Sequence, residues 1–572
     1  MYGFQLVRSA KVAPKLAALL LFGATASAQT YTKLYQWPGT TRGDNGIIAT
    51  EKLSQGRDGL LYGTIFDDGT LAAGEAYKIT TTGTFTTLWA FCQQKNCPDG
   101  AQPEGGVILG LDGNFYGTTA VGGVNNRGVG TVFQLTPSGT HTKLYDFTSG
   151  TSPAAIGDGG YPAFGLLQGA DGNFYGVNPD VYAGDYGLAY KLTPKPTPPW
   201  TFKLLGDFNA TNGWGPNLPT QGADGNFYGT TNIGGNSTTC KSGLHGCGVV
   251  YKMSAAGKLA VLHTFVGVPL DGYDPVGILA EGTDDNFYGT TYSGGATGQG
   301  SIFKITPTGV FTELHDFNHT GTNLDGYNPY AGLILGSDGN FYGTAVRGGG
   351  YGAGAIYRIT PSGTYTIVYN FCKISHCPDG FYPITSLVQH TNGKFYGSTS
   401  GNTLGGSYFY SLDMGLGPFI IPMTRSGKAG VTVEILGTGL TGASSVNFGA
   451  GSAAFTVVSD TYMTAVVPSA GTLGQISVTT PTGTFVSNYT FKVLPVVQSF
   501  TPTIGPPGTV VTITGTSLLG ATKVTIGGVA CTFTVNSDTQ ITATVAASAK
   551  TGKIAVTTLG GVATSAASFT VN

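Results

Sequence analysis

The residues of this sequence best suited to covalent or metal chemistry are its seven cysteines, six of which lie in close pairs. The pairs are Cys92 with Cys97 (FCQQKNC), Cys240 with Cys247 (CKSGLHGC), and Cys372 with Cys377 (FCKISHC). In an exported chain, such spacings predict three small disulfide loops. A zinc site is the alternative, but four ligands would have to converge from distant loops, with no Cys-x-x-Cys among them. The disulfide interpretation is therefore favoured, and Cys531 is left as a core thiol on an alternating strand.

A second set of polar residues recurs at one place in a repeated unit, in the loop that precedes each unit's first strand. Its members are Asp44, Asp99, Asp158, Asp271, Asp325 and Asp379, with Asn212 at the corresponding place. Carboxylates gathered on one face suit Ca²⁺. However, Asp-Gly also makes a turn by bonding its own backbone, and no unit has a dense Asp-x-Asp-x-Asp loop. We therefore predict turns here, with no metal and no cofactor.

Aromatic residues follow these carboxylates by two or three positions. They are Tyr161, Trp214, Tyr273, Tyr327 and Phe381. On an exposed face such rings would stack against sugars, whereas in a packed interior they would fill the seams between sheets. The seam interpretation is favoured because aromatic residues supply most of the buried area in such folds. These five residues nevertheless remain the candidate binding face.

Catalytic motifs are absent from the sequence. It contains no His-Glu-x-x-His, no Gly-x-Ser-x-Gly and no phosphate-binding Gly-rich loop. The segments expected to be innermost, such as GGVILG (105–110), carry no His, Arg, Asp or Glu, and Glu51 and Glu104 are the nearest carboxylates. We predict no catalytic residues, although a carboxylate pair for glycoside hydrolysis could still come from loops.

The elements that must position these residues are read from an internal repeat. The segment Asp-Gly-Asn-Phe-Tyr-Gly-Thr and its variants place a Tyr at 62, 116, 175, 228, 288, 342 and 396. Each unit of about 55 residues holds four strand-sized runs bounded by Gly, Asp and Pro, which is typical of one blade of a β-propeller. The seventh unit lacks its fourth strand, and YTKLYQW (31–37) resembles that missing strand. The repeats therefore predict seven blades, with the first strand of the chain completing the last blade.

The order of strands also predicts two different faces. In such a blade the 1-2 and 3-4 turns lie on one face, and the 2-3 and 4-1 connections lie on the other. Here the first set is nearly constant, whereas the second set varies in length and holds all three cysteine pairs. The variable face is where recognition is expected.

Two family resemblances extend this interpretation. The repeats, through DGNFYGTT, the strand at 300–306 and DGYNP (325–329), resemble the GloVer-type tandem repeat of exported bacterial proteins. Two further segments align with each other at an offset of 78 residues, and the opening FTPTIGPPGTVVTITGTSL (500–518) resembles an IPT/TIG domain. These resemblances imply a propeller, export and two immunoglobulin-like sandwiches, without a transferable reaction.

Composition agrees with an exported all-β protein. The chain of 572 residues has 93 Gly and only 10 % charged residues, and its net charge of −2 favours neither nucleic acid nor an anionic membrane. Residues 1–28 have the positive start, apolar run and Ala26-Ser27-Ala28 site of a signal peptide. We expect cleavage near Ala28, a secreted or periplasmic product, and no transmembrane segment in the mature chain.

The prediction is therefore an all-β protein with a seven-bladed β-propeller followed by two immunoglobulin-like β-sandwich domains. Its domains are a signal peptide (1–28), the propeller (29–414) and IPT/TIG-like domains at 415–494 and 495–572. The predicted function is non-catalytic binding or adhesion, with a glycan or a cell-surface protein as partner. The alternative is a carbohydrate-active lyase or hydrolase with accessory sandwiches.

Overall fold

The structure is a computed structural model that describes residues 29–37, 52–66, 73–123, 129–148, 157–179, 186–237, 240, 246–318, 324–400, 407–469, 471 and 473–572. Within these ranges the chain forms β-strands and no helix. Accordingly, no described segment is a helix long and apolar enough to cross a membrane. The predicted signal peptide (1–28), Asp44 and Glu51 lie outside the described residues.

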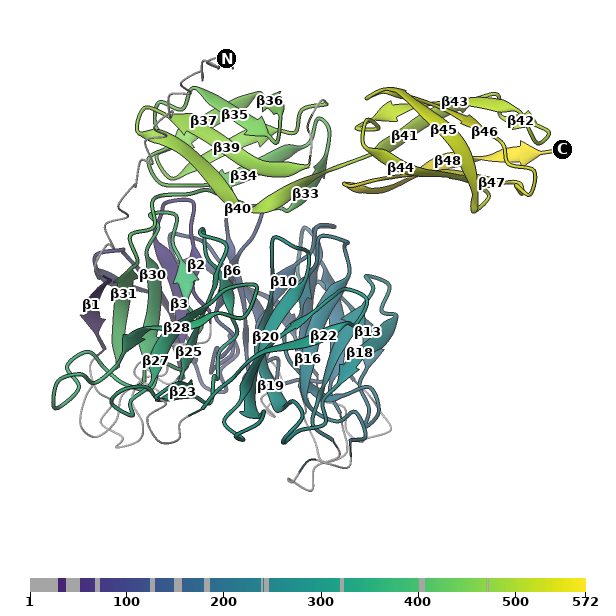
Figure 1. The fold of residues 1–572 in the computed structure, drawn as a ribbon. Helices are drawn as coiled ribbons and strands as arrows, with labels where there is room; N and C mark the ends of the chain where they lie inside the picture. The colour runs from purple at the N-terminus through teal and green to yellow at the C-terminus, as the bar shows by residue number, and fades with distance from the viewer. Residues whose placement is uncertain are drawn as a thin grey trace, which may run out of the picture.

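Strands β1 to β31 build a series of antiparallel sheets, one per repeat (Figure 1). The first three sheets are β2 (Ser54–Gln55), β3 (Leu61–Ile65), β4 (Glu75–Ile79) and β5 (Phe85–Ala90); β6 (Val107–Leu109), β7 (Phe115–Thr119), β8 (Thr131–Leu135) and β9 (His141–Asp146); and β10 (Leu167–Gln168), β11 (Phe174–Asn178), β12 (Leu188–Thr193) and β13 (Thr201–Asp207). The fourth is β14 (Trp214–Pro216) and β15 (Thr220–Gln221) beside β16 (Phe227–Ile233), β17 (Val249–Met253) and β18 (Leu259–Thr264), and the fifth is β19 (Gly272–Glu281), β20 (Phe287–Gly294), β21 (Ser301–Ile305) and β22 (Phe311–Asp316). We number these sheets as blades 1 to 5.

Blade 6 contains β24 (Ile334–Leu335), β25 (Phe341–Ala345), β27 (Ala355–Ile359) and β28 (Tyr365–Asn370), extended by the pair β23 (Gly326–Tyr327) and β26 (Arg347–Gly348). Blade 7 contains β29 (Val388–Gln389), β30 (Phe395–Thr399) and β31 (Tyr408–Asp413), and its outer strand is β1 (Thr30–Gln36) from the start of the chain. The β1 register runs from Thr30 opposite Asp413 to Gln36 opposite Tyr408. The predicted completion of the last blade by the first strand is therefore observed.

Apolar clusters join each blade to the next around a ring. Each cluster combines residues of two consecutive blades, from blades 1 and 2 through blades 6 and 7. A further cluster joins Leu61 and Tyr77 of blade 1 with Tyr396 and Phe409 of blade 7. Both faces of each sheet are therefore covered by neighbours, which explains the low charge of the repeats.

The glycine of each Phe-Tyr-Gly segment is required by a close approach inside the blade. A Cβ on Gly229 would lie 2.5 Å from the Tyr251 hydroxyl on the next strand, and one on Gly289 would lie 2.5 Å from the Phe303 ring. The aromatic ring of the third strand therefore occupies the space over the second strand that a side chain would otherwise fill.

The Asp-Gly-Asn segments form the 1-2 hairpin turns, as predicted. The Asp112 carboxylate accepts hydrogen bonds from the Asn114 backbone N–H at 3.1 Å and from the Tyr116 hydroxyl at 2.7 Å. The tyrosine hydroxyl donates to the equivalent carboxylate in the other units, except in blade 7, where Asn392 replaces Asp and its Nδ2 donates to the Tyr396 hydroxyl at 2.9 Å. The repeated carboxylate therefore fixes its own turn and the tyrosine that follows.

Two β-sandwiches follow the propeller. The first contains β32 (Ile421–Pro422), β33 (Ser426–Lys428), β34 (Thr432–Leu436), β35 (Ser445–Phe448), β36 (Gly451–Ala453), β37 (Phe455–Ser459), β38 (Tyr462–Val466), β39 (Gly474–Thr480) and β40 (Gly483–Leu494). The second contains β41 (Val496–Thr501), β42 (Ile504–Gly505), β43 (Val510–Thr516), β44 (Ala521–Ile526), β45 (Val529–Ser537), β46 (Gln540–Thr544), β47 (Gly552–Thr558) and β48 (Gly561–Val571). Each has its own apolar core, and Cys531 packs half-buried against the second core with Phe533 and Val535.

The first sandwich stands on the Asp-Gly-Asn face of the propeller, and the second extends sideways from it (Figure 1). Arg57 beside the first turn donates to Glu434 at 2.6 Å, and Lys492 pairs with Asp285 at 3.1 Å. Arg425 pairs with the buried Glu281. The face with constant turns is therefore covered near its centre by the first sandwich, which lies on the opposite side from the variable connections.

Candidate functional site

The variable connections lie on the side of the propeller opposite the first sandwich, and we call this side the loop face (Figure 1). Disulfides join Cys92 to Cys97 in the connection from β5 to β6, and Cys372 to Cys377 in that from β28 to β29. A third joins Cys240 to Cys247 between β16 and β17. All three predicted disulfides are present, and all three constrain loops of this face.

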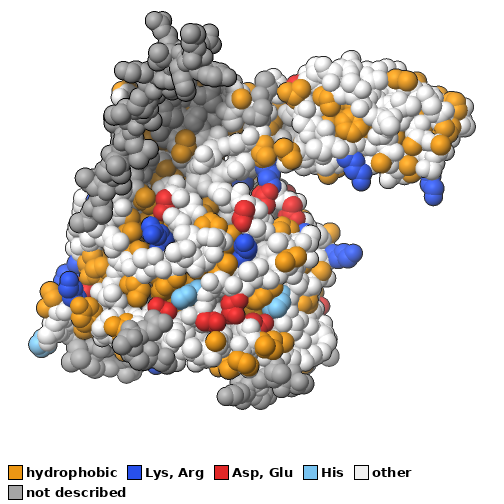
Figure 2. Space-filling view, viewed as in Figure 1, with side chains coloured by type: hydrophobic (Ala, Val, Ile, Leu, Met, Phe, Trp, Pro, Cys, Tyr) orange, Lys and Arg blue, Asp and Glu red, His pale blue; other side chains and the backbone are white. Residues whose placement is uncertain are grey.

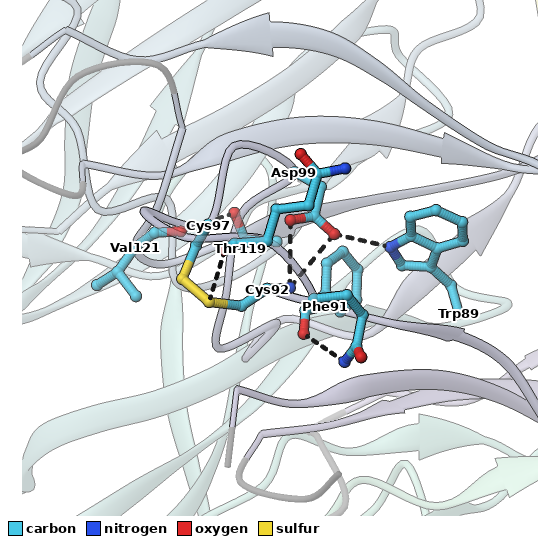
Figure 3. The surroundings of a disulfide bond; sticks show 9 residues. Trp89, Phe91, Cys92, Cys97, Asp99, Thr119 and Val121 are labelled. Carbon is cyan, nitrogen blue, oxygen red and sulfur yellow. Dashed lines mark hydrogen bonds between the residues drawn. A yellow bond between two sulfur atoms is a disulfide. The ribbon is translucent and has the colours of Figure 1, made fainter. Parts of the chain in front are cut away.

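The carboxylates of the 4-1 connections anchor these loops to the outer strands. Figure 3 shows the Asp99 carboxylate accepting from the Cys92 backbone N–H at 3.2 Å and from Trp89 Nε1 at 3.1 Å. The equivalent carboxylates bond the next-to-last residue of the outer strand in the same way, pairing Asp158 with Tyr145, Asp271 with His263, Asp325 with His315, and Asp379 with Tyr369. Burial also raises the pKa of Asp158, although its hydrogen bonds counteract this.

These carboxylates are therefore structural in the blades described. Asp99, Asp158, Asp271 and Asp379 each accept from a loop backbone N–H and from an outer-strand side chain, and the Asp325 carboxylate lies 3.2 Å from His315 Nε2. In the described part of the chain, no three His, Cys, Asp or Glu side chains are placed to hold a metal ion. The residue one position before the end of the outer strand is a Trp, Tyr or His in each of these cases. Its place before each Asp is the sequence signal that could have predicted the contact.

Most of the predicted aromatic residues lie in extended backbone that continues the first strand of a blade. Trp214 pairs with Ile233, Tyr273 with Ser293, and Tyr327 with Arg347. Tyr273 and Tyr327 pack half-buried against the clusters between blades, and Trp214 lies edge-on to Tyr186 at 5.2 Å. These three rings are held by contacts within the protein.

Phe381 requires a correction. Its side chain is only 3 % exposed and belongs to the cluster between blades 6 and 7. A ring at this depth offers no face to a ligand. The residue after it, Tyr382, is instead exposed.

Tyr161 belongs to a different structural position from the other four candidates. It has φ +54° and directly precedes Pro162, as Gln102, Gly215, Asp274, Asn328 and Tyr382 precede a proline with positive φ in other blades. These residues lie where each 4-1 connection enters a first strand. The Tyr161 hydroxyl donates to Glu104 Oε1 at 3.0 Å, and burial raises the pKa of this tyrosine to about 12.

Three exposed tyrosines that the sequence analysis missed lie on the loop face around blade 6. Tyr330 is 47 % exposed, Tyr351 is 52 % and Tyr382 is 38 %. Tyr382 N–H donates to the Ala353 carbonyl at 2.8 Å, and Val346 N–H donates to the Asn328 carbonyl at 3.3 Å, so the segments that carry the three rings are bonded to one another. We call Tyr330, Tyr351 and Tyr382 the tyrosine surface.

Exposed aliphatic side chains also occur in connections of the loop face. Leu270, Leu324 and Ile374, in the connections around blades 5 to 7, are 72 %, 47 % and 65 % exposed. In Figure 2 hydrophobic side chains and several acidic groups are both present in the loop-side part of the propeller, and acidic and basic groups also lie together where the first sandwich meets it. Exposed rings rimmed by polar loops are typical of an interaction site.

Two carboxyl groups with raised pKa values also lie at the loop-side ends of first strands. Burial raises the pKa of Asp274 to about 6, and it raises the pKa of Glu104 despite the hydrogen bond from Tyr161. Glu104 belongs to blade 2 and Asp274 to blade 5, so they approach the axis from blades that are not neighbours. The described residues therefore hold two separate carboxyl groups here, each in its own surroundings.

Comparisons with solved structures give similarities with TM-scores below 0.5. A surface glycan-binding protein from Prevotella bryantii is 19 % identical, with a TM-score of 0.21 over 26 % of this chain and 41 % of that one. A protein of a xyloglucan utilization locus in Bacteroides uniformis is also 19 % identical, with a TM-score of 0.15 over 26 % and 48 %. This chain therefore spans less than half the length of either protein.

A fungal alcohol oxidase in complex with copper is 13 % identical, with a TM-score of 0.40 over 82 % of this chain and 99 % of that one. These likenesses carry no functional assignment to this chain. No curated protein matches it.

The family comparisons cover both parts of the chain. The Gloeobacter/Verrucomicrobia repeat matches residues 20–157 and 237–410, which is more than half of the sequence. The IPT/TIG domain matches residues 418–493 and 495–571. The chain therefore belongs to the Gloeobacter/Verrucomicrobia repeat family, and two IPT/TIG domains follow its repeats.

Proposed function

We propose that this protein is exported and binds a glycan through the tyrosine surface of its loop face, without catalysing a reaction. The observation that carries the proposal is the exposure of three tyrosines on loops around blade 6 whose backbones are hydrogen-bonded to one another. A tyrosine ring presents an apolar face for the C–H groups of a sugar and a hydroxyl for its polar edge. The disulfide between Cys372 and Cys377 restrains the loop that leads to Tyr382, so less order is lost on binding.

The arrangement of the domains also supports this choice of face. The first IPT/TIG domain occupies the Asp-Gly-Asn face, so a large polymeric ligand can reach the propeller most freely from the loop face. A cell-surface protein that carries sugars would present the same chemistry. The two IPT/TIG domains would then act as spacers that leave the loop face of the propeller accessible.

The test is a glycan array with the mature protein, followed by calorimetry on the best ligand. We expect each of Tyr330→Ala, Tyr351→Ala and Tyr382→Ala to weaken binding about 2- to 12-fold, the range for one aromatic contact. Tyr382→Phe keeps the ring and should bind nearly as well as the parent. Val310→Ala, at a residue 63 % exposed in a turn of the opposite face, is the matched control.

Unchanged binding by the triple alanine variant would overturn the assignment of the site. Release of new reducing ends or unsaturated products from the bound glycan would overturn the non-catalytic role and favour the carbohydrate-active enzyme. In that case Glu104→Gln and Asp274→Asn identify which of the two carboxyl groups takes part.

A further inference from the structure

The propeller axis holds two adjoining cavities beneath the first IPT/TIG domain, of about 370 and 260 Å³. Residues from the first strands of all the blades line them, and the IPT/TIG domain contributes Ile421 and Arg425 to both. The smaller cavity extends from Phe419 and Tyr489 of that domain to the exposed Tyr330 at the loop side. The axis is therefore a space covered at one end and directed toward the loop face at the other.

The walls of this space are mainly apolar. Its inward positions on the first strands include Ile108, Leu167, Ala280, Ile334 and Val388, all of which are only partly buried because they face the cavities. The volume is that of a site for a small organic molecule rather than for a few waters.

One cation in these walls has no partner among the residues that the structure describes. Of the charged residues that line the two cavities, Glu281 and Arg425 pair with each other. Lys52 lines both cavities, and among the described residues its ammonium has no hydrogen bond or ion pair. Glycine or an uncharged residue stands at the corresponding place in the other blades, as Gly106, Gly165 and Ile278 do.

An unpaired ammonium in such surroundings is poorly solvated. Burial lowers the pKa of Lys52, because the apolar walls disfavour its charged form. The other ionisable groups that face the space are Glu281, Arg425 and Tyr489, and Arg425 lies between the other two, over the Tyr489 ring at 4.3 Å. An anion beside Lys52 would restore the favourable charge balance, and an apolar body would fill the remaining space.

We propose that the axial cavity binds a small organic carboxylate, with its carboxylate group on the Lys52 ammonium and its apolar part against the first strands. The carboxylate accepts N–H donors of Lys52, and the hydrocarbon part displaces water from Ile108, Leu167 and Val388. This site is separate from the tyrosine surface, and it requires no glycan.

The probe is octanoate, titrated into the mature protein at pH 7 by calorimetry, with 1-octanol as the uncharged probe of the same chain length. We expect octanoate to bind in a one-to-one ratio and at least 10-fold more tightly than octanol. Lys52→Met should lose at least 10-fold in octanoate affinity and little in octanol affinity. Lys52→Arg should stay within a few-fold of the parent, and Lys258→Met, at an exposed lysine of a blade 4 turn, should not differ.

Lys52→Met should also fold at least as well as the parent, because it removes an unpaired buried charge. Ala280→Phe supplies a second variant, which keeps Lys52 but fills the space and should weaken both probes. The proposal is overturned if octanoate fails to bind the parent protein at millimolar concentration, if it binds Lys52→Met equally well, or if octanol binds as tightly as octanoate. None of these outcomes depends on whether the tyrosine surface binds a glycan.

Discussion

Removal of Arg425 should destabilise the protein more than removal of its partner Glu281. The Glu281 side chain is 3 % exposed, whereas that of Arg425 is 33 % exposed. Arg425→Ala therefore leaves a buried carboxylate without its cation, while Glu281→Gln leaves a guanidinium that water still reaches. Loss of one partner of a buried pair costs about 3–5 kcal/mol. Glu281 keeps a hydrogen bond from the Ala223 backbone N–H at 2.9 Å, so we expect about 2–3 kcal/mol for Arg425→Ala.

Other blades already have glutamine at the position equivalent to Glu281. Gln168, Gln221 and Gln389 stand at the same place and accept the corresponding backbone N–H of the preceding blade. A glutamine at 281 can therefore keep this bond, and we expect a cost of about 0.5–1 kcal/mol. The double variant should be more stable than Arg425→Ala alone by about 1–2 kcal/mol, because it removes the stranded charge.

The assay is urea unfolding followed by tryptophan fluorescence, which reports on the propeller because all four Trp precede residue 215. Burial raises the pKa of Glu281 and Arg425 lowers it, so the variant without Arg425 should have a still higher pKa at this carboxyl. The destabilisation caused by Arg425→Ala should then be absent near pH 4, where the Glu281 carboxyl is protonated in both the folded and the unfolded chain. It should grow as the pH rises. The reasoning is refuted if Arg425→Ala costs no more than Glu281→Gln, or if the double variant is no more stable than Arg425→Ala.

Three further outcomes follow from the loop face. Asp379→Ala should cost about 1–3 kcal/mol in unfolding free energy, because the Tyr369 hydroxyl and Cys372 N–H lose their acceptor, and Asp379→Asn should cost less; equal costs for both variants would contradict the anchoring role. Asp274→Asn should raise the melting temperature at pH 7.5 and not at pH 4, since the buried carboxyl has a pKa of about 6 and its ionised form destabilises the fold above the unfolded value; a gain at pH 4 as large as that at pH 7.5 would argue against this ionisation. Replacing Cys92 and Cys97 by Ser should lower the unfolding free energy by about 2 kcal/mol, as expected for closure of so short a loop; a reductant should abolish the difference, and a difference that persists would point to another cause.

Much of the fold could be predicted because the repeat encodes it locally. Each Asp-Gly-Asn turn and each Phe-Tyr-Gly strand carries the residues that fix its own geometry, such as the Asp112 to Tyr116 hydrogen bond. The alternation of strands and turns then gives the blade order without long-range information. The position of the first IPT/TIG domain could not be predicted in this way, because it depends on pairs such as Arg57 with Glu434 that lie far apart in sequence.

The candidate site was predicted less well, because exposure depends on backbone direction rather than on residue type. Counting two residues from each Asp selects extended positions whose rings turn into the seams, and Phe381 is the clearest case. The exposed rings of Tyr382 and Tyr330 instead flank the prolines that end the 4-1 connections, Pro383 and Pro329. The residues beside the equivalent prolines of the other blades, such as Tyr161 and Asp274, are not exposed, so neither the Asp nor the proline by itself marks the open positions.

The pairing of β1 with β31 also determines when the propeller can finish folding. β1 precedes the strands of all the other blades in the sequence and β31 follows them, so the ring closes only once residue 413 is available. Until then the hydrogen-bonding edge of β1 is open to other chains, and the contacts that cover it have the largest sequence separation in the propeller. Ring closure is thus a late event in folding, and we expect premature exposure of this edge, rather than loss of any single blade, to drive aggregation of truncated chains.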